Sequence, residues 1–296
     1  MTPPARPPLT PLEHDLAGLG RSLAGAPGEP VALPTRNDAV VVRVGDVVVK
    51  AHAPGTDPHA LQARLAACAR LRGIALPPLK TTVTWVGGRP VTLWPAGEPV
   101  DHADPDAAPW EDAARLLAAL HAVPLRELPP LPPAGGPARL ARTLARLDGD
   151  TTAEADAVRR AAARLPRVWE PPSGAGLTHG DWHLGQLVRH GNGWLLIDAD
   201  DLGGGDQAWD LARPAAWFAA GLLDPEAWRR FLSAYRAAGG PALAGVADPW
   251  ERLDLPARAL AVQLAAGALA TARRESRPID EVETALVDAC RRIAAL

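Results

Sequence analysis

The sequence has little of several residue types that mark particular classes of protein. Its 296 residues include only 2 cysteines, 1 methionine, 1 tyrosine and 2 phenylalanines. The two cysteines, Cys68 and Cys290, lie far apart within apolar helical patterns. A disulfide framework of the kind found in small secreted proteins is therefore not indicated, and we expect reduced thiols in the core of a cytoplasmic protein.

Excess charge and long apolar runs are also missing. The chain has 31 Lys and Arg residues against 34 Asp and Glu residues, a formal net charge of -3. This balance does not favour a basic surface for nucleic acid. No segment reaches 18 uncharged apolar residues, and the N-terminal MTPPARPPLTPLEHD has no apolar run that fits a signal peptide. We therefore expect neither nucleic acid nor membrane as a partner, and the sequence leaves the oligomeric state open.

The first hundred residues carry the β-strand patterns. Residues 39–50 read AVVVRVGDVVVK, in which two β-branched runs flank a short turn, and this predicts a hairpin. Further on, TTVTWV and PVTLWP flank a GGR turn and predict a second hairpin. Short helices are expected over residues 11–24 and 59–72. Residues 1–94 are thus predicted to form a small, mostly antiparallel lobe.

The rest of the chain is predicted to be helical. An amphipathic helix begins at Trp110, and helical periodicity returns over residues 138–165. Two of four C-terminal helices are expected to begin at the Asp-Pro pairs of residues 224–225 and 248–249. The fold class is therefore α+β, with a β-rich lobe followed by a larger helical lobe over residues 95–296.

The stretch LTHGDWHLGQLVRHGNGWLLIDADDL, residues 177–202, concentrates polar side chains between apolar runs. Asp181 and Gln186 share one loop, and the GNG turn sends the chain back through WLLI to bring Asp198 beside them. Phosphoryl transfer from ATP needs Mg²⁺ held against the phosphates and a carboxylate beside the attacking hydroxyl. Since Mg²⁺ prefers oxygen ligands, Asp198 and the Gln186 carbonyl are candidates to hold it, with Asp181 as the base.

These motifs resemble those of the aminoglycoside phosphotransferase family, which shares the fold of eukaryotic-like kinases. The resemblance rests on HGDWHLGQ, LLIDADDLGGGDQAWDLA, the lysine of VVVK, the WP pair at residues 94–95 and LLAALHAVP, and it covers nearly the whole chain. It implies a protein-kinase-like, two-lobed fold. It also implies ATP-dependent transfer of the γ-phosphoryl group to a hydroxyl of a small molecule such as an aminoglycoside, a sugar or an amino alcohol.

Position by position, the resemblance implies four roles: Asp181 as the catalytic base, Gln186 and Asp198 as the Mg²⁺ ligands, and Lys50 as the lysine that binds the phosphates. In the same motif, His179 resembles a structural residue that shapes the catalytic loop. Further candidates are Asn37, Trp94, Pro95 and Ala96 for contacts with ATP, and His183, Asp200 and Trp217 for contacts with the substrate.

Three features depart from the family pattern. Gln186 stands where the family usually has asparagine, although HGDxHLGQ is similar to a motif of bacterial maltokinases. The loop LPTRNDAV, expected to cover the phosphates, has no glycine. The helix HALQARLAAC has no acid to pair with Lys50. An alternative therefore stays open, in which the chain is a pseudokinase that acts as a nucleotide-binding or interaction module.

Several of these residues also have simpler interpretations. His179, Asp181 and His183 form an H-x-D-x-H pattern that a metal-dependent hydrolase would use, but no second paired-histidine motif accompanies it. Lys50 is also compatible with the solvated end of an edge strand.

Charged and aromatic residues after the motif mostly favour structural roles. Asp206 is expected to cap a helix, and Asp210 to brace the loop that carries Asp181. The tryptophans at positions 209, 217, 228 and 250 are expected in the core, with Trp217 as the exception to watch. The C-terminal helices offer acids and arginines together, so their charge does not select a substrate. These are Asp224, Asp248, Glu251, Asp254 and Glu275, and Arg213, Arg229, Arg230, Arg252 and Arg258.

Overall fold

The computed structural model describes residues 8–25, 28–35, 38–101, 104, 107–170 and 174–296. The chain forms two compact units, which are described separately. Unit 1 consists of Met1–Pro99, Leu128–Pro130 and Val188–Ala199, and unit 2 consists of Val100–Glu127, Leu131–Leu187 and Asp200–Leu296. The sequence predicts a division into two continuous segments, residues 1–94 and 95–296. Unit 1 also includes two later segments of the chain, Leu128–Pro130 and Val188–Ala199. Residues 188–199 belong with unit 1 because their backbone pairs with strands and loops of that unit.

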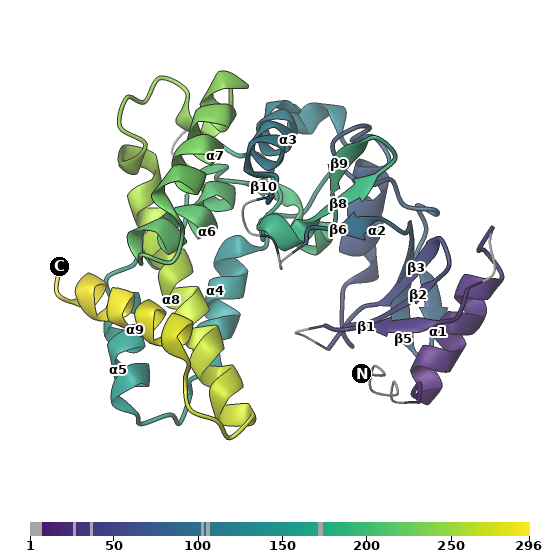
Figure 1. Cartoon of the computed structure of the whole chain (residues 1–296), viewed down its shortest axis with the longest axis horizontal. Helices are drawn as coiled ribbons and strands as arrows, with labels where there is room; N and C mark the ends of the chain where they lie inside the picture. The colour runs from purple at the N-terminus through teal and green to yellow at the C-terminus, as the bar shows by residue number, and fades with distance from the viewer. Residues whose placement is uncertain (1–7, 26–27, 36–37, 102–103, 105–106, 171–173) are drawn as a thin grey trace. The chain divides into compact units, whose positions relative to one another are not determined.

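Unit 1 is built on a five-stranded antiparallel sheet (Figure 1) with the order β1-β2-β3-β5-β4. The strands are β1 (Val31–Leu33), β2 (Val40–Val44), β3 (Val47–Ala51), β4 (Thr84–Val86) and β5 (Arg89–Pro95). Strands β2 and β3 turn at Gly45, whose φ of 57° lies in the left-handed region that glycine adopts without strain. Both predicted hairpins, β2–β3 and β4–β5, are therefore confirmed.

Helix α1 (Pro11–Arg21) packs against this sheet and closes the core of unit 1. It begins with a capping box, in which the Thr10 hydroxyl accepts from the Glu13 N–H and the Glu13 carboxylate accepts from the Thr10 N–H. Its buried Leu16 and Ala17 meet the valines and leucine of β2, β3 and β5. Burial of these apolar side chains is the main stabilising contribution to the sheet.

The stretch over residues 177–202 contributes two strands, β8 and β9, to a three-stranded sheet with the order β6-β8-β9. Its strands are β6 (Glu98–Pro99), β8 (Leu187–His190) and β9 (Gly193–Leu196). The Leu76 N–H donates to the Leu196 carbonyl at 2.8 Å, and the Leu196 N–H donates to the Ile74 carbonyl at 2.9 Å. These bonds fasten the end of β9 to the segment that follows α2 (Pro58–Cys68).

Helix α2 is shorter than the sequence predicts over residues 59–72. Its C-cap is Ala69, and Gly73 follows with a φ of 74°. The chain must leave the helix there because residues 74–76 extend to pair with Leu196.

Unit 2 is mainly helical, as the sequence predicts. Its helices are α3 (Trp110–Ala122), α4 (Gly136–Ala145), α5 (Ala153–Ala162), α6 (Ala208–Ala219), α7 (Pro225–Ala237), α8 (Trp250–Arg274) and α9 (Glu281–Ala294). Helix α8 packs against α4, α5, α6 and α9, so it forms the centre of the bundle (Figure 1). Strands β7 (Gly176–Thr178) and β10 (Gly203–Gly205) pair antiparallel, and β7 packs against α3.

Two helix boundaries differ from the predictions. The periodic run over residues 138–165 is interrupted between α4 and α5, where Gly149 has a φ of 76° and Thr152 caps the new helix. Helix α7 begins at Pro225 with Asp224 as its N-cap, as predicted. Helix α8 begins one residue after its Asp-Pro pair, at Trp250, whose N–H donates to the Asp248 carboxylate at 3.0 Å.

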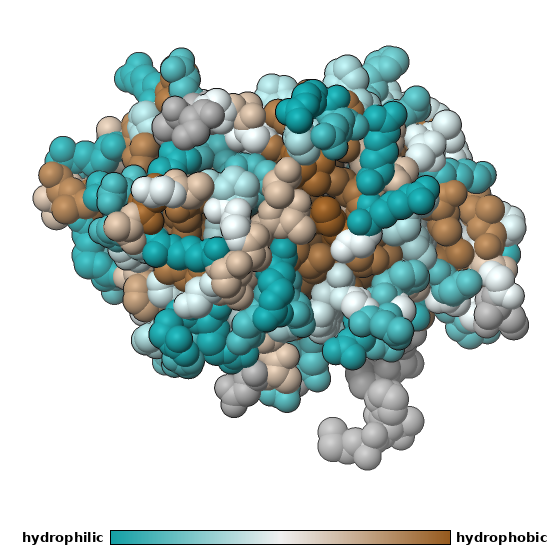
Figure 2. All heavy atoms as spheres, turned by 90° about the horizontal axis from the view of Figure 1, so that it is seen from above, coloured by the Kyte–Doolittle hydropathy of each residue, from teal (hydrophilic) through white to brown (hydrophobic). Residues whose placement is uncertain are grey.

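Helix α8 is the one helix in the described ranges that is long and apolar enough to cross a membrane, by length and composition only. Its most apolar window is 61% buried inside the structure, as in the core helix of a soluble protein. On the face drawn in Figure 2, hydrophilic side chains are interspersed with apolar ones. Cys68 and Cys290 are both buried and are not joined in a disulfide, as predicted.

Candidate active site

Lys50 and Asp198 form an ion pair inside unit 1. Lys50 lies on β3 between Val41 and Thr92 of the neighbouring strands. Its Nζ is 2.5 Å from Oδ1 of Asp198, and the two side chains are 15% and 37% exposed. Lys50 is therefore directed to a site rather than to solvent, unlike the usual lysine of an edge strand.

Asp198 follows β9 in an unusual backbone conformation. Its φ of 60° lies in the left-handed region, where among the described residues only one other non-glycine residue, Ser276, is found. Aspartate is one of the few residues that tolerate this conformation, and such residues cluster at functional sites. The backbone ties of Leu196 to residues 74–76 hold the strand end from which the Asp198 side chain projects.

Helix α2 has no acid to pair with Lys50, as its sequence shows, and carries Gln62 and Arg64 instead. Since Lys50 pairs with Asp198, the lysine head remains charge-compensated without an acid on α2. The ion pair on Lys50 thus comes from elsewhere in the chain.

The predicted nucleotide contacts at the end of β5 already take part in hydrogen bonds. The Trp94 Nε1–H donates to the Thr92 hydroxyl at 2.9 Å. The Ala96 N–H donates to the Asp46 carbonyl at 2.7 Å, so this N–H is engaged within the protein. Pro95 has no N–H to offer. Asn37 lies outside the described residues.

The loop that carries Asp181 is held by a buried carboxylate of unit 2. Asp210, on the first turn of α6, is fully buried. Its Oδ2 accepts from the His179 N–H at 2.6 Å, and its Oδ1 accepts from the Gly180 N–H at 2.8 Å. Gly180 has a φ of 87°, and a Cβ there would lie 2.4 Å from the Asp201 carbonyl, so only glycine fits. The prediction that Asp210 braces this loop is confirmed.

A hydrogen-bonded chain extends from Asp210 into the helices. His121 lies 3.0 Å from Asp210 through Nε2 and 2.7 Å from the Tyr235 hydroxyl through Nδ1. The Ala242 N–H donates to the same hydroxyl at 3.1 Å. The Asp210 carboxylate can only accept, so His121 donates to it from Nε2. In a neutral ring Nδ1 is then an acceptor, and the Tyr235 hydroxyl donates to it. Burial raises the pKa of Tyr235, which keeps the phenol protonated.

The Asp181 side chain contacts two arginines of unit 2. Arg213 Nη2 lies 2.7 Å from its Oδ1, and Arg139 Nη2 lies 3.2 Å from its Oδ2. Arg139 also forms an ion pair with Asp201. The sequence did not predict either contact, although Arg213 lies one turn after Asp210 on the same helix, a spacing that puts both on one face.

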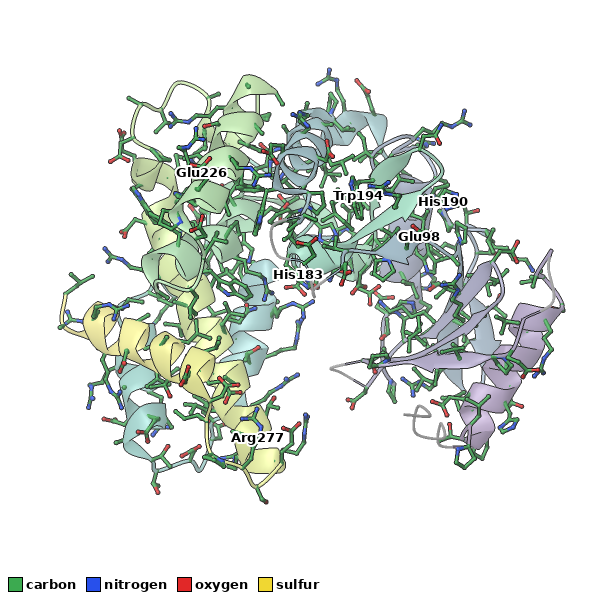
Figure 3. All side chains as sticks on the ribbon, in the orientation of Figure 1. Glu98, His183, His190, Trp194, Glu226 and Arg277 are labelled. Atoms are coloured by element: carbon green, nitrogen blue, oxygen red, sulfur yellow. The ribbon has the colours of Figure 1, made fainter. Side chains whose placement is uncertain are left out.

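The remaining residues of the loop are held by local contacts. His183 (Figure 3) caps the short 3-10 helix Leu184–Gln186, because its Nδ1 accepts from the Gly185 N–H at 3.0 Å. Gln186 is buried and its N–H donates to the His183 carbonyl at 2.8 Å. Among the residues that the structure describes, no three His, Cys, Asp or Glu side chains are grouped to hold a metal.

The predicted substrate residues lie in unit 2 near the ends of elements. Asp200 is half-buried in the turn Ala199–Asp201, and Trp217 on α6 is 38% exposed. Trp209 and Trp228 are buried, as predicted for core tryptophans.

Most of the acids named on the C-terminal helices have structural partners. Asp224 accepts from the Glu226 N–H, Asp248 from the Trp250 N–H, Asp254 pairs with Arg258, and Glu275 pairs with Arg277. Asp206, which accepts from the Ala208 N–H at 3.0 Å and so caps α6 as predicted, also pairs with Arg252. The contacts of these acids therefore indicate structural roles at helix ends and in ion pairs rather than a surface for a cationic substrate.

A model of the phosphotransferase enzyme family matches residues 27–255, which is most of the chain. No curated protein sequence matches the chain.

Several solved structures have similar folds over nearly the whole chain. A choline kinase from Streptococcus pneumoniae is 14% identical, with a TM-score of 0.64 over 96% of this chain and 97% of that one. An aminoglycoside phosphotransferase from Streptomyces rimosus is 21% identical, with a TM-score of 0.59 over 86% and 99% of the two chains. A spectinomycin phosphotransferase, solved with ADP and spectinomycin, is 12% identical, with a TM-score of 0.59 over 96% and 98%. At these identities the likeness is one of fold, and it confirms the predicted kinase-like fold.

Proposed function

Because the chain belongs to the phosphotransferase enzyme family, we propose that it is a kinase that transfers the γ-phosphoryl group of ATP to a hydroxyl of a small molecule. Similar folds act on choline and on aminoglycosides, and one was solved with ADP. These neighbours support ATP as the donor and a small organic acceptor of the aminoglycoside, sugar or amino alcohol type.

The observation that carries this proposal is the ion pair between Lys50 and Asp198, 2.5 Å apart. A lysine that binds phosphates and a carboxylate that binds Mg²⁺ act on the same Mg·ATP in kinases, so a kinase is expected to place the two side chains close together. The strained φ of 60° at Asp198 supports a functional role for this residue.

The donor atoms present fit Mg²⁺, since Asp198 offers carboxylate oxygens and Gln186 an amide oxygen, and both are hard ligands. When bound, Mg²⁺ would neutralise charge that develops on the phosphates. Lys50 would bind the phosphates, and Asp181 would accept the proton of the acceptor hydroxyl. The acceptor oxygen forms a bond to the γ-phosphorus as the bond from that phosphorus to the leaving ADP oxygen breaks.

The alternative is a pseudokinase, motivated by the glycine-free loop and the missing helix glutamate. The presence of Lys50, Asp181 and Asp198 together supports an active enzyme, because a protein without turnover has little need of all three. The two functions differ in turnover rather than in nucleotide binding.

The test is a screen of the purified protein against hydroxyl compounds, scored by ADP release with Mg·ATP. We expect release that depends on one class of acceptor. We also expect Asp181→Asn to lower the rate at least a hundredfold while the stabilisation of the protein by Mg·ATP persists, because the base is lost without a phosphate contact. Activity of Asp181→Asn within tenfold of the parent would contradict the assignment of the base, and nucleotide binding without any ADP release would favour the pseudokinase.

The place of action and the partners are part of the same proposal. A cytoplasmic location agrees with two buried cysteines that are not joined in a disulfide, and with ATP as the donor. A small molecule is the expected partner rather than a nucleic acid or a membrane.

A further inference from the structure

The carboxylate of Asp181 is held from both sides by guanidinium groups. Arg213 binds Oδ1 at 2.7 Å and Arg139 binds Oδ2 at 3.2 Å. The side chains of Asp181, Arg213 and Arg139 are 15%, 16% and 28% exposed, respectively. Ion pairs that are this far removed from solvent are screened less than pairs on an open surface. We call Arg139 and Arg213 the arginine clamp.

Helix α6 supplies one half of the clamp and the anchor for the loop backbone. Asp210 and Arg213 are three residues apart and therefore lie on one helical face. Asp210 fixes the N–H groups of His179 and Gly180, and Arg213 fixes the carboxylate of the next residue, Asp181. A single helix face thus holds both the backbone and the side chain of the loop.

Helix α4 supplies the other half through a close approach at its N-terminus. A Cβ on Gly135 would lie 1.8 Å from Oδ1 of Asp201, and a Cβ on Gly136 would lie 2.1 Å from Nε1 of Trp209. The Gly135 N–H donates to the Asp201 carbonyl at 3.0 Å. These contacts seat α4 against the segment after Asp198 and bring Arg139, one turn later, onto the carboxylates of Asp181 and Asp201.

We infer that Arg139 and Arg213 are positioning residues for the phosphoryl transfer, and that they act by fixing the orientation of the Asp181 carboxylate. This inference rests on the proposed function. Each carboxylate oxygen has lone pairs for about two hydrogen bonds, so an oxygen bound to one guanidinium still accepts from a hydroxyl. The hydrogen bond from Arg213 to Oδ1 and the ion pair of Arg139 with Oδ2 together restrict rotation about the Cβ–Cγ bond, a torsion that is otherwise soft.

Fixed orientation matters because the acceptor proton must reach an oxygen of Asp181 while the acceptor oxygen is aligned with the γ-phosphorus. A displacement of about 1 Å from such a geometry can cost a hundredfold in rate. The clamp therefore affects the rate of the chemical step rather than the affinity for ATP, which other residues bind.

The test uses Mg·ATP as the probe with water as the acceptor, in which case ADP release follows attack of water on the γ-phosphorus. The acceptor found by the screen replaces water once it is known. Arg213→Gln, Arg213→Lys, Arg139→Gln and Arg139→Lys are compared with the parent for kcat and for KM of Mg·ATP. The control is Arg252→Gln, which removes a partly buried arginine paired with Asp206 at 2.8 Å and not with Asp181.

We expect each glutamine variant to lower kcat at least tenfold while KM of Mg·ATP changes less than threefold. Lysine restores the charge but not the geometry of a guanidinium, so the lysine variants should recover part of the rate. The control variant should stay within threefold of the parent in both parameters.

A second comparison shows whether the arginines act through Asp181. Each glutamine substitution is repeated in Asp181→Asn, where it should lower the residual rate less than twofold because there is no carboxylate left to orient. An equal loss in both backgrounds, or a loss that appears in KM alone, overturns the inference. If a glutamine variant does not fold, the lysine variant at the same position takes its place in the comparison with Asp181→Asn, and there too an equal loss of rate in both backgrounds overturns the inference.

The outcomes separate this inference from the proposed function. If Mg·ATP neither stabilises the parent against heat nor is hydrolysed, the proposed function is wrong and the inference falls with it. If the parent hydrolyses Mg·ATP and the glutamine variants match its kcat, only the inference is overturned.

Discussion

Replacement of Asp210 by asparagine should destabilise unit 2 by a large and calculable amount. The carboxylate is fully buried and accepts three hydrogen bonds, from the His179 N–H, the Gly180 N–H and His121. Oδ2 takes two of them and Oδ1 takes one. Asparagine keeps one oxygen, so its amide is best placed with the oxygen at Oδ2 and the NH₂ group facing the Gly180 N–H.

The cost has two parts. The bond from Gly180 is lost and a buried N–H is left without an acceptor, which costs about 1–3 kcal/mol. The two bonds that remain are to a neutral oxygen, and hydrogen bonds to charged groups contribute about 1 kcal/mol more each than neutral ones. The free energy of unfolding should therefore fall by about 3–5 kcal/mol, in the range measured when one partner of a buried charged pair is removed.

Urea unfolding followed by tryptophan fluorescence measures this loss, since Trp182 and Trp209 are buried in the same unit. The matched control is Asp224→Asn. Asp224 is the exposed N-cap of α7 and belongs to no buried hydrogen-bond network, and asparagine caps helices about as well as aspartate. The control should unfold within experimental error of the parent. A loss below about 1 kcal/mol for Asp210→Asn would show that the buried network contributes little, and would refute the hydrogen-bond argument.

Three other outcomes follow from the site and the core. Asp198→Asn suits the left-handed backbone but removes the charge, so stabilisation of the protein by Mg·ATP in a thermal melt should need at least tenfold more nucleotide; an unchanged titration would rule out Asp198 as a ligand. Gln186→Asn should retain activity with a higher Mg²⁺ requirement, whereas Gln186→Leu should lose most activity, and equal Mg²⁺ titrations for the parent and the leucine variant would assign Gln186 to packing alone. Burial raises the pKa of Cys290 to about 12, so iodoacetamide at pH 8 should modify it only in denaturant, and labelling of the native protein seen by mass spectrometry would contradict that burial.

Local patterns in the sequence were sufficient for the elements near the site. The β-branched runs around Gly45 predict the hairpin that carries Lys50, and the spacing from the motif to Asp210 predicts the brace on the loop. The hairpin depends on residues that are neighbours in the sequence, and the Asp210 brace depends on one motif with a fixed geometry. The capping of α6 by Asp206 is local in the same way.

The partners of Asp181 could not be predicted because they come from distant helices. Arg139 lies in a segment with no motif, and the fold alone brings it to a residue 42 positions later, from Arg139 to Asp181. The end of α2 was missed for a related reason, since the helix stops where residues 74–76 pair with Leu196, far along the chain.

The two glycines at the start of α4 make the clamp recognisable in other sequences. Because Gly135 and Gly136 leave no room for a side chain against Asp201 and Trp209, and Arg139 must follow one turn later, the contact reduces to the pattern G-G-x-x-R, here GGPAR. A kinase-like chain that has this pattern some forty residues before its HGD motif is expected to hold the aspartate of that motif with the arginine, as Arg139 holds Asp181 here. Chains in which a larger residue occupies either glycine position should then orient that aspartate by other means.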